Sequence, residues 1–224
     1  MLKNNLIITT ARRGKITRSQ KSVLIDNDNL CTINSNVNFF ELFGNTNKVV
    51  CEIGFGDGDC LVEMALLHPE YNFLGIELYL SGVGAALIKI RDLGIRNIRI
   101  VNMDARLVMG FLPDNSLERL NVLFSDPWPK TRMNKRRLIN VEMLSGWLKK
   151  INVGAGVYIA TDDAGYQEFI SLQIAQLSNV DVVDTSTIHF MPNSMKRPVT
   201  KFETKGLKKG NKTKEWYLLK TRNI

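Results

Sequence analysis

The sequence predicts an α/β fold of the Rossmann-like type, with a mostly parallel, seven-stranded sheet and an antiparallel strand at its C-terminal edge. Three observations lead to this prediction. Short apolar runs alternate with helical stretches, as in repeated strand–helix units. The first run, residues 49–53, opens into glycines at positions 54, 56 and 58. That run and the later ones end near acidic residues, as strands do when their carboxyl ends line a binding crevice.

The chain has 224 residues, of which 44% are apolar, enough for one domain with a sizeable core. We expect this domain to span residues 41–224. Residues 1–40 differ from it, since cations and asparagines are concentrated there. They are predicted to form a basic, mobile arm, although a solvated tail without a role would have the same composition.

Cysteine usage and hydropathy indicate a cytoplasmic protein with no membrane partner and no metal. The three cysteines have no CxxC spacing, and Cys51 falls within the first predicted strand, so neither a disulfide framework nor a zinc site is expected. No apolar run approaches the roughly 20 residues that a membrane span needs. Residues 6–8 are too short a run for the core of a signal peptide.

The first strand predicts a cofactor site. Glu52 stands near its tip, two residues before Gly54 and four before Gly56, and glycines let the backbone turn tightly and approach a ligand. A carboxylate here would repel a pyrophosphate bound at the following helix N-terminus, whereas it suits an ammonium group. S-adenosylmethionine carries an amino group and a sulfonium but no phosphate, so the loop favours this cofactor over a dinucleotide. A plain turn is the alternative.

Two further acids follow the next two predicted strands. Glu77 ends the run at residues 73–77, where a carboxylate accepts hydrogen bonds from ribose hydroxyls. Asp104 follows the run at residues 98–101 and is assigned to the adenine amino group. A solvated acid at a strand end is the alternative for each, but neighbouring parallel strands would bring all three acids to one crevice.

The fourth predicted strand, residues 120–124, leads to Asp126 between a serine and Pro127. Proline holds the residue before it in an extended conformation, so Asp126 is predicted to face the methyl donor as the catalytic residue. The alternative is a turn-capping aspartate. Asp162 follows a fifth strand, residues 156–160, and is expected in the same crevice.

The net charge of +8 indicates a polyanionic partner. Five cations lie within the eight residues that follow the Asp126 loop, where phosphate contact is a better explanation than an ordinary solvated charge run. These are Lys130, Arg132, Lys135, Arg136 and Arg137.

The C-terminal part predicts two strands, around residues 182–183 and 216–219, that pair like a hairpin. Between them, residues 194–203 combine cations, an aromatic residue and a carboxylate, which is the mixture that recognition of an RNA base requires. A simple linker is the alternative.

The motifs together resemble those of the bacterial tRNA (guanine-N7)-methyltransferases of the TrmB type, over nearly the whole chain. The matching stretches are Arg12-Arg13-Gly14-Lys15 with Thr17 and Gln20, Glu52-Ile53-Gly54-Phe55-Gly56, Gly75-Ile76-Glu77, Asp126-Pro127-Trp128-Pro129-Lys130, Lys135-Arg136-Arg137 and Arg197-Pro198-Val199-Thr200-Lys201-Phe202-Glu203. The last is more specific than any glycine loop. Ser125 and Met133 depart from the pattern, which usually has proline and histidine there.

The resemblance implies a class I S-adenosylmethionine-dependent methyltransferase that modifies nitrogen-7 of a guanine in the variable loop of tRNA, at position 46. It implies cofactor contacts at Glu52, Gly54, Gly56, Glu77, Asp104 and Asp126, with Asp126 also catalytic. Substrate contacts would be Lys130, Asp162, Thr200, Lys201, Phe202 and Glu203. Other RNA contacts would be Arg132, Lys135, Arg136 and Arg137.

Other functions stay open from the sequence. A methyltransferase acting on another RNA or on a protein would share the cofactor residues but would not require tRNA. A catalytically inactive RNA-binding relative would be expected to lack the strand-end acids, which are present here. Whether the protein is a monomer or a homodimer is also open.

Overall fold

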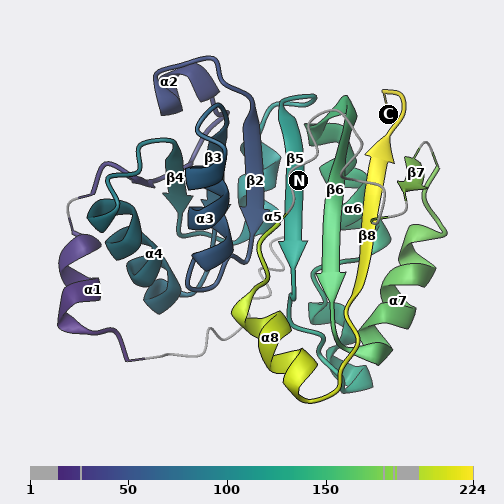
Figure 1. Ribbon diagram of the computed structural model, residues 1–224. Helices are drawn as coiled ribbons and strands as arrows, with labels where there is room; N and C mark the ends of the chain where they lie inside the picture. Colours follow the sequence, from purple (N-terminus) through teal and green to yellow (C-terminus); the bar gives the residue numbers. More distant parts are fainter. Residues whose placement is uncertain (1–14, 26, 179, 184, 186–196, 224) are drawn as a thin grey trace.

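The computed structural model describes residues 15–25, 27–178, 180–183, 185 and 197–223, with only the backbone of Phe202 (Figure 1). Residues 12–14 of the N-terminal motif and residues 194–196 of the C-terminal segment therefore lie outside the described residues. Eight strands of the described chain form one sheet in the order β1-β4-β3-β2-β5-β6-β8-β7.

Five parallel strands form the central part of the sheet, and each corresponds to an apolar run that predicted a strand. Their side chains are mostly buried because helices cover both faces. β2 is buried at every position and lies between β3 and β5, parallel to both. The bounds are β2 Val49–Ile53, β3 Asn72–Ile76, β4 Ile98–Val101, β5 Leu117–Leu123 and β6 Ile151–Thr161.

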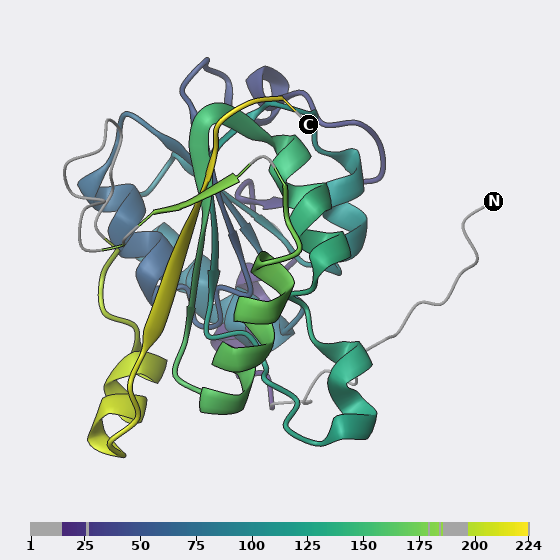
Figure 2. The same ribbon diagram turned by 90° about the vertical axis from the view of Figure 1, so that its right-hand side faces the viewer.

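Two groups of helices cover the two faces of the sheet, and each group has its own apolar core (Figures 1 and 2). α3 and α4 pack on one face, where Leu61, Met64 and Leu87 are fully buried. α5, α6 and α7 pack on the other face, where Trp147 and Tyr166 are buried. The bounds are α3 Asp59–Leu67, α4 Leu80–Asp92, α5 Ala105–Phe111, α6 Val141–Lys150 and α7 Ala164–Ile174.

The C-terminal edge of the sheet is antiparallel, as the sequence predicts. β8, Lys214–Lys220, lies between β6 and β7, Val180–Val183, and runs antiparallel to both, so the predicted strand pair is confirmed. The sheet has eight strands rather than seven because β1, Leu30–Cys31, adds to β4. Two residues are too few for a periodicity that reveals a strand.

One helix in this part was not predicted. α8, Lys201–Lys208, lies between β7 and β8, in a stretch for which an RNA-recognition segment without regular structure, or a simple linker, was expected. Its N-cap is Thr200, whose hydroxyl accepts a hydrogen bond from the backbone N–H of Glu203 at 3.1 Å. The helix has only eight residues, fewer than the roughly 11 to 18 over which hydrophobic periodicity is recognised.

The described part of the N-terminal segment is helical where it meets the sheet domain. α1, Arg18–Val23, begins with a capping box formed by Thr17 and Gln20. The side chain of Gln20 also donates to the carbonyl of Ser81 in α4 at 3.0 Å. A further short helix, α2, spans Phe39–Phe43. The mobility of the arm and the domain boundary at residue 40 stay predictions.

Within the ranges given above, no helix is long and apolar enough to cross a membrane. The same residues include no group of three or more His, Cys, Asp or Glu side chains arranged to hold a metal ion. The three cysteines are free thiols, and two of them, Cys51 and Cys60, are buried.

Candidate active site

The loop after β2 depends on glycine at three positions. Gly54, Gly56 and Gly58 have φ angles of 73°, 57° and 76°, in the left-handed region that favours glycine. Gly82 in the first turn of α4 contacts this loop so closely that a Cβ atom there would overlap the carbonyl oxygen of Gly56. The loop is therefore a tight backbone cradle between β2 and the N-terminal ends of α3 and α4.

Glu77 fastens this loop to the end of β3. Its Oε2 accepts a hydrogen bond from the N–H of Gly56 at 2.8 Å. Its Oε1 accepts from the N–H groups of Leu78 and Tyr79 at 2.7 and 2.8 Å. Burial raises the pKa of Glu77, while these backbone hydrogen bonds act in the opposite direction. The predicted ribose acceptor thus also sets the shape of the glycine loop.

Glu52 is buried beneath the loop, with 3% of its surface exposed. Its Oε2 has no hydrogen-bond partner among the described residues. Burial raises the pKa of Glu52 to about 7, and the charges of Arg119 and Arg197 limit the rise. An acceptor that is buried without a donor is costly, so this atom fits the ammonium group of a ligand.

Asp104 follows β4 and caps α5, since its Oδ1 accepts from the N–H of Arg106 at 2.9 Å. Asn102, two residues earlier, donates to the carbonyl of Glu77 at 2.8 Å. β2, β3 and β4 are parallel neighbours in the sheet, so Glu52, Glu77 and Asp104 lie at the same edge. The three acids thus follow neighbouring parallel strands, while their roles as cofactor contacts stay predictions.

Asp126 lies on the next strand end, because β5 pairs with β2 on the side opposite to β3. Its side chain is exposed. The loop around it is strained, since Phe124 and Trp128 have positive φ angles of 51° and 45°, which non-glycine residues rarely adopt. Burial is the main cause of the raised pKa of Glu77, and the negative charge of nearby Asp126 raises this pKa further.

The basic stretch divides into an exposed and a buried part. Lys130, Arg132 and Lys135 are exposed, and the last two lie in a 3-10 helix, η1, Thr131–Arg136. Arg136 is half-buried, with its guanidinium 5.1 Å from the centre of the Trp128 ring.

Arg137 differs from its neighbours because it is buried, with 8% exposed. Its Nε donates to the carbonyl of Pro127 at 2.8 Å, and its guanidinium lies 4.4 Å from the centre of the Phe169 ring. Arg137 therefore holds the Asp126 loop from inside. The surface part of the predicted RNA contact consists of Arg132, Lys135 and Arg136.

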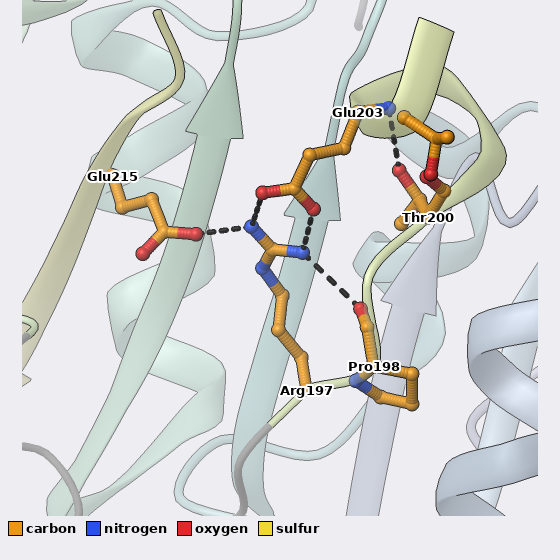
Figure 3. A network of polar contacts seen from close by, with 6 residues as sticks. Arg197, Pro198, Thr200, Glu203 and Glu215 are labelled. Atoms are coloured by element: carbon orange, nitrogen blue, oxygen red, sulfur yellow. Dashed lines mark hydrogen bonds and ion pairs between the residues drawn. The ribbon is translucent and has the colours of Figure 1, made fainter. Parts of the chain in front are cut away.

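The C-terminal segment lies beside the strand ends (Figure 3). Glu203 forms a bidentate ion pair with Arg197, with N–O distances of 2.6 and 3.0 Å. Lys201 pairs with Asp59, at the start of α3, at 2.7 Å. Thus α8 is connected both to the sheet and to the helix behind the glycine loop. Phe202 lies in the first turn of α8, and its side chain lies outside the described part.

Asp162 lies against the same helix. Its Oδ2 accepts a hydrogen bond from the side chain of Asn211 at 2.8 Å, and α8 approaches it so closely at Gly206 that a Cβ there would overlap the carboxylate. Asp162 therefore lies against the C-terminal half of α8, and its contact with the substrate stays a prediction.

Comparison with known proteins identifies the family. A family model described as "Putative methyltransferase" matches residues 46–216. The tRNA (guanine-N(7)-)-methyltransferase of Vibrio cholerae serotype O1 (strain M66-2) is 38% identical over 209 residues, which cover 89% of this chain and 85% of the relative. The enzyme of the same name from Buchnera aphidicola subsp. Acyrthosiphon pisum (strain 5A) is 37% identical, covering 90% and 85%. The chain belongs to the tRNA (guanine-N7)-methyltransferase family.

Two of the solved structures with similar folds are methyltransferases of low sequence identity. An rRNA methylase from Streptococcus thermophilus has a TM-score of 0.51 and 12% identity, covering 79% of this chain and 88% of that one. The aminoglycoside resistance methyltransferase NpmB1 has a TM-score of 0.50 and 14% identity, covering 80% and 90%. The predicted Rossmann-like, class I methyltransferase fold is thereby confirmed.

The site of this tRNA (guanine-N7)-methyltransferase family member also contains buried arginines whose contacts were not predicted from the sequence. Arg119 in β5 is buried, with its guanidinium 4.6 Å from the centre of the Tyr158 ring. Arg197 and Glu215 meet beside the same tyrosine. A cation within an apolar strand run was the available signal for Arg119. Arg197 stood within a recognised motif, but the motif did not reveal its contacts.

Proposed function

We propose that this protein transfers a methyl group from S-adenosylmethionine to nitrogen-7 of a guanine in tRNA. The observation that carries the proposal is family membership over about nine-tenths of the chain, with relatives named for this reaction. The crevice supports it, because acids follow successive parallel strands and a basic surface lies next to them. A tRNA substrate makes the cytoplasm the compartment that we propose.

The residues of the crevice fit the cofactor. The buried Oε2 of Glu52 lacks a hydrogen-bond partner within the described chain and would accept the ammonium group. Gly54 leaves room for a ligand next to the backbone, and Gly56 has the positive φ that the tight turn requires. Glu77 and Asp104 would receive the ribose hydroxyls and the adenine amino group. When bound, S-adenosylmethionine supplies a methyl group that is electrophilic because it is attached to a sulfonium.

Nitrogen-7 of guanine carries an in-plane lone pair, so the attacking atom needs no deprotonation. Catalysis then rests on positioning, which is worth on the order of 7 to 11 kcal/mol for well-aligned reactants. The exposed carboxylate of Asp126 would accept hydrogen bonds from the ring N–H and the exocyclic amine of guanine, which adenine does not offer together. Its negative charge would also stabilise the cationic methylated purine.

The tRNA contacts that we propose surround this loop. Arg132, Lys135 and Arg136 would meet phosphates, and Lys130, Asp162 and residues 200–203 would contact the region of the target guanine. For the guanine at position 46 of the variable loop, tertiary pairing would cover nitrogen-7, so the base would turn out of its pairing. That step costs a few kcal/mol, which contacts from the basic surface offset.

The test is methyl transfer from labelled S-adenosylmethionine to an unmodified tRNA transcript, followed by digestion to nucleosides. The expected product is 7-methylguanosine, absent when the guanine at position 46 is replaced by adenine. A different methylated nucleoside, or label in RNAs lacking the tRNA fold, would favour a methyltransferase acting on another RNA. Label in protein alone would favour a protein methyltransferase.

A further inference from the structure

Arg197 is a nearly buried cation at the start of the C-terminal segment, with 9% exposed. Nη1 donates to Oε2 of Glu203 at 2.6 Å, and Nη2 donates to Oε1 at 3.0 Å (Figure 3). Nη2 also donates to Oε1 of Glu215 in β8, and Nη1 to the carbonyl of Pro198 at 3.2 Å. One guanidinium thus connects the first turn of α8 to the sheet.

The guanidinium also contacts the base of the Asp126 loop. It lies 5.7 Å from the ring centre of Phe124 and 5.7 Å from that of Tyr158. Phe124 is the strained residue with a φ of 51°, two positions before Asp126. Arg197 therefore touches the end of β5 and the recognition segment of residues 200–203 at the same time.

The charges around Arg197 make its guanidinium the fixed centre of this network. Burial alone would lower the pKa of Arg197, but the hydrogen bonds that it donates to Glu203 and the charge of Glu215 outweigh burial and raise the pKa. Burial raises the pKa of Glu52, and the charge of Arg197 limits this rise, although less than the charge of Arg119 does. A planar fork with this set of partners cannot be replaced by a compact ammonium.

Both carboxylate oxygens of Glu203 are engaged by Arg197, and the backbone N–H of Glu203 is engaged by Thr200. The residues assigned to guanine contact are thereby fixed relative to β8 and the Asp126 loop. We propose that Arg197 is a positioning residue for methyl transfer: it holds Thr200 and Glu203 in register with Asp126, and Glu203 acts through this ion pair. This inference rests on the proposed function.

The experiment compares single-turnover methylation of tRNA by Arg197→Met and Arg197→Lys with that of the wild type, at saturating cofactor and tRNA. Arg197→Met should slow the step on the order of 10²-fold, as expected for a small misplacement of reacting groups, and the saturating cofactor keeps any change in cofactor affinity out of this rate. Arg197→Lys should recover only part of the loss, because it keeps the charge without the fork. Full rescue by lysine would overturn the proposal.

A matched control is Lys220→Met, at the other end of β8. Lys220 is also buried, and its Nζ donates to Oδ1 of Asn115 at 2.7 Å and to the carbonyl of Ile151 at 2.9 Å, away from the crevice. This variant should lower the melting temperature without slowing methyl transfer. If Arg197→Met and Lys220→Met slow the step equally, Arg197 contributes only to stability and the proposal fails.

The double variant Arg197→Met/Glu203→Gln tests whether Glu203 acts through Arg197 or independently of it. If Glu203 acts through Arg197, the double variant is no slower than the slower single variant, whereas independent roles give multiplied losses.

Hydrogen exchange of the α8 amides gives a readout that needs no tRNA. Exchange should speed up in Arg197→Met and not in Lys220→Met, and unchanged exchange would overturn the proposal. A wild type that does not methylate tRNA contradicts the proposed function instead.

Discussion

Glu77 and Glu203 are both carboxylates beside the crevice, yet they are held by different means. Glu77 accepts three backbone N–H groups from residues within its own strand end and the glycine loop. Glu203 in α8 is held by the side chain of Arg197, which also forms an ion pair with Glu215 in β8. The first arrangement is fixed by backbone geometry, and the second by ion pairs between separate segments.

The same difference extends to the two halves of the crevice. We define the cofactor half as the ends of β2, β3 and β4 with the glycine loop, and the substrate half as the Asp126 loop, η1, Asp162 and residues 197–211. Backbone contacts hold the first half, whereas the second half relies on Arg137, Arg197 and Asn211. A single substitution should therefore disturb positioning more in the substrate half, and ligand affinity more in the cofactor half.

The largest expected effect is at Asp126, where the two halves meet. Asp126→Asn keeps the shape of the side chain but removes its charge, so single-turnover methylation of tRNA should fall by roughly 10²- to 10³-fold, as for the loss of a comparable electrostatic group. Cofactor affinity should change little. Asp181→Asn on the exposed part of β7 is the control. A near wild-type rate would make Asp126 a turn residue and Asp162 the better candidate for holding guanine.

A second prediction concerns Glu52 in the cofactor half. Its pKa is raised by burial from 4.5 to about 7, so ionising it costs the folded protein on the order of 3 kcal/mol. This cost is absent below pH 4.5, grows as the pH rises and is complete above about pH 7. Glu52→Gln should therefore raise the melting temperature at pH 8 more than at pH 5, while cofactor binding weakens.

Thermal unfolding at the two pH values and calorimetry with S-adenosylmethionine measure these effects. Glu63→Gln is the control, because Glu63 is an exposed acid in the neighbouring helix α3. If Glu52→Gln is destabilising at pH 8, the carboxylate is stabilised by contacts within the protein. It would then not be reserved for a ligand.

The smallest expected effect concerns the basic stretch. Replacing Arg132, Lys135 and Arg136 by glutamine should weaken tRNA binding and reduce its salt dependence by a slope of roughly 0.7 to 0.9 per lost phosphate contact. Arg137→Gln should leave the slope unchanged, because Arg137 is buried against Phe169, and should slow methylation instead. Binding titrations across a salt series make the comparison. Equal slope changes in both variants would place Arg137 on the RNA surface.

The cofactor half could be predicted from the sequence because its signals are local. An apolar run that ends in Glu52 and the glycines specifies both a strand and its loop. Glu77 and Asp104 repeat the pattern on the next two strands, and parallel neighbours bring them together. The three hydrogen bonds that Glu77 accepts from backbone N–H groups were not predictable, because they depend on the path of the loop.

The substrate half was less predictable because its contacts join distant segments. Arg137 belongs to the same charge run as Lys135, and only the packing of Phe169 from α7 separates a buried cation from an exposed one. The pairing of Arg197 with Glu215 brackets α8, a helix of only eight residues that is too short for its periodicity to stand out in the sequence. The family resemblance marked this segment as important, but it did not give these contacts.

β8 is the last of the eight strands in chain order, yet it lies between two others and carries the Glu215 partner of Arg197. Because ribosomes make proteins from the N-terminus, β2, β3 and the glycine loop emerge long before β8 does. A growing chain therefore possesses the elements that bind a small cofactor well before those that hold the recognition segment. A chain still under synthesis, surrounded by tRNA, would lack the β8 partner of the segment that we propose recognises it.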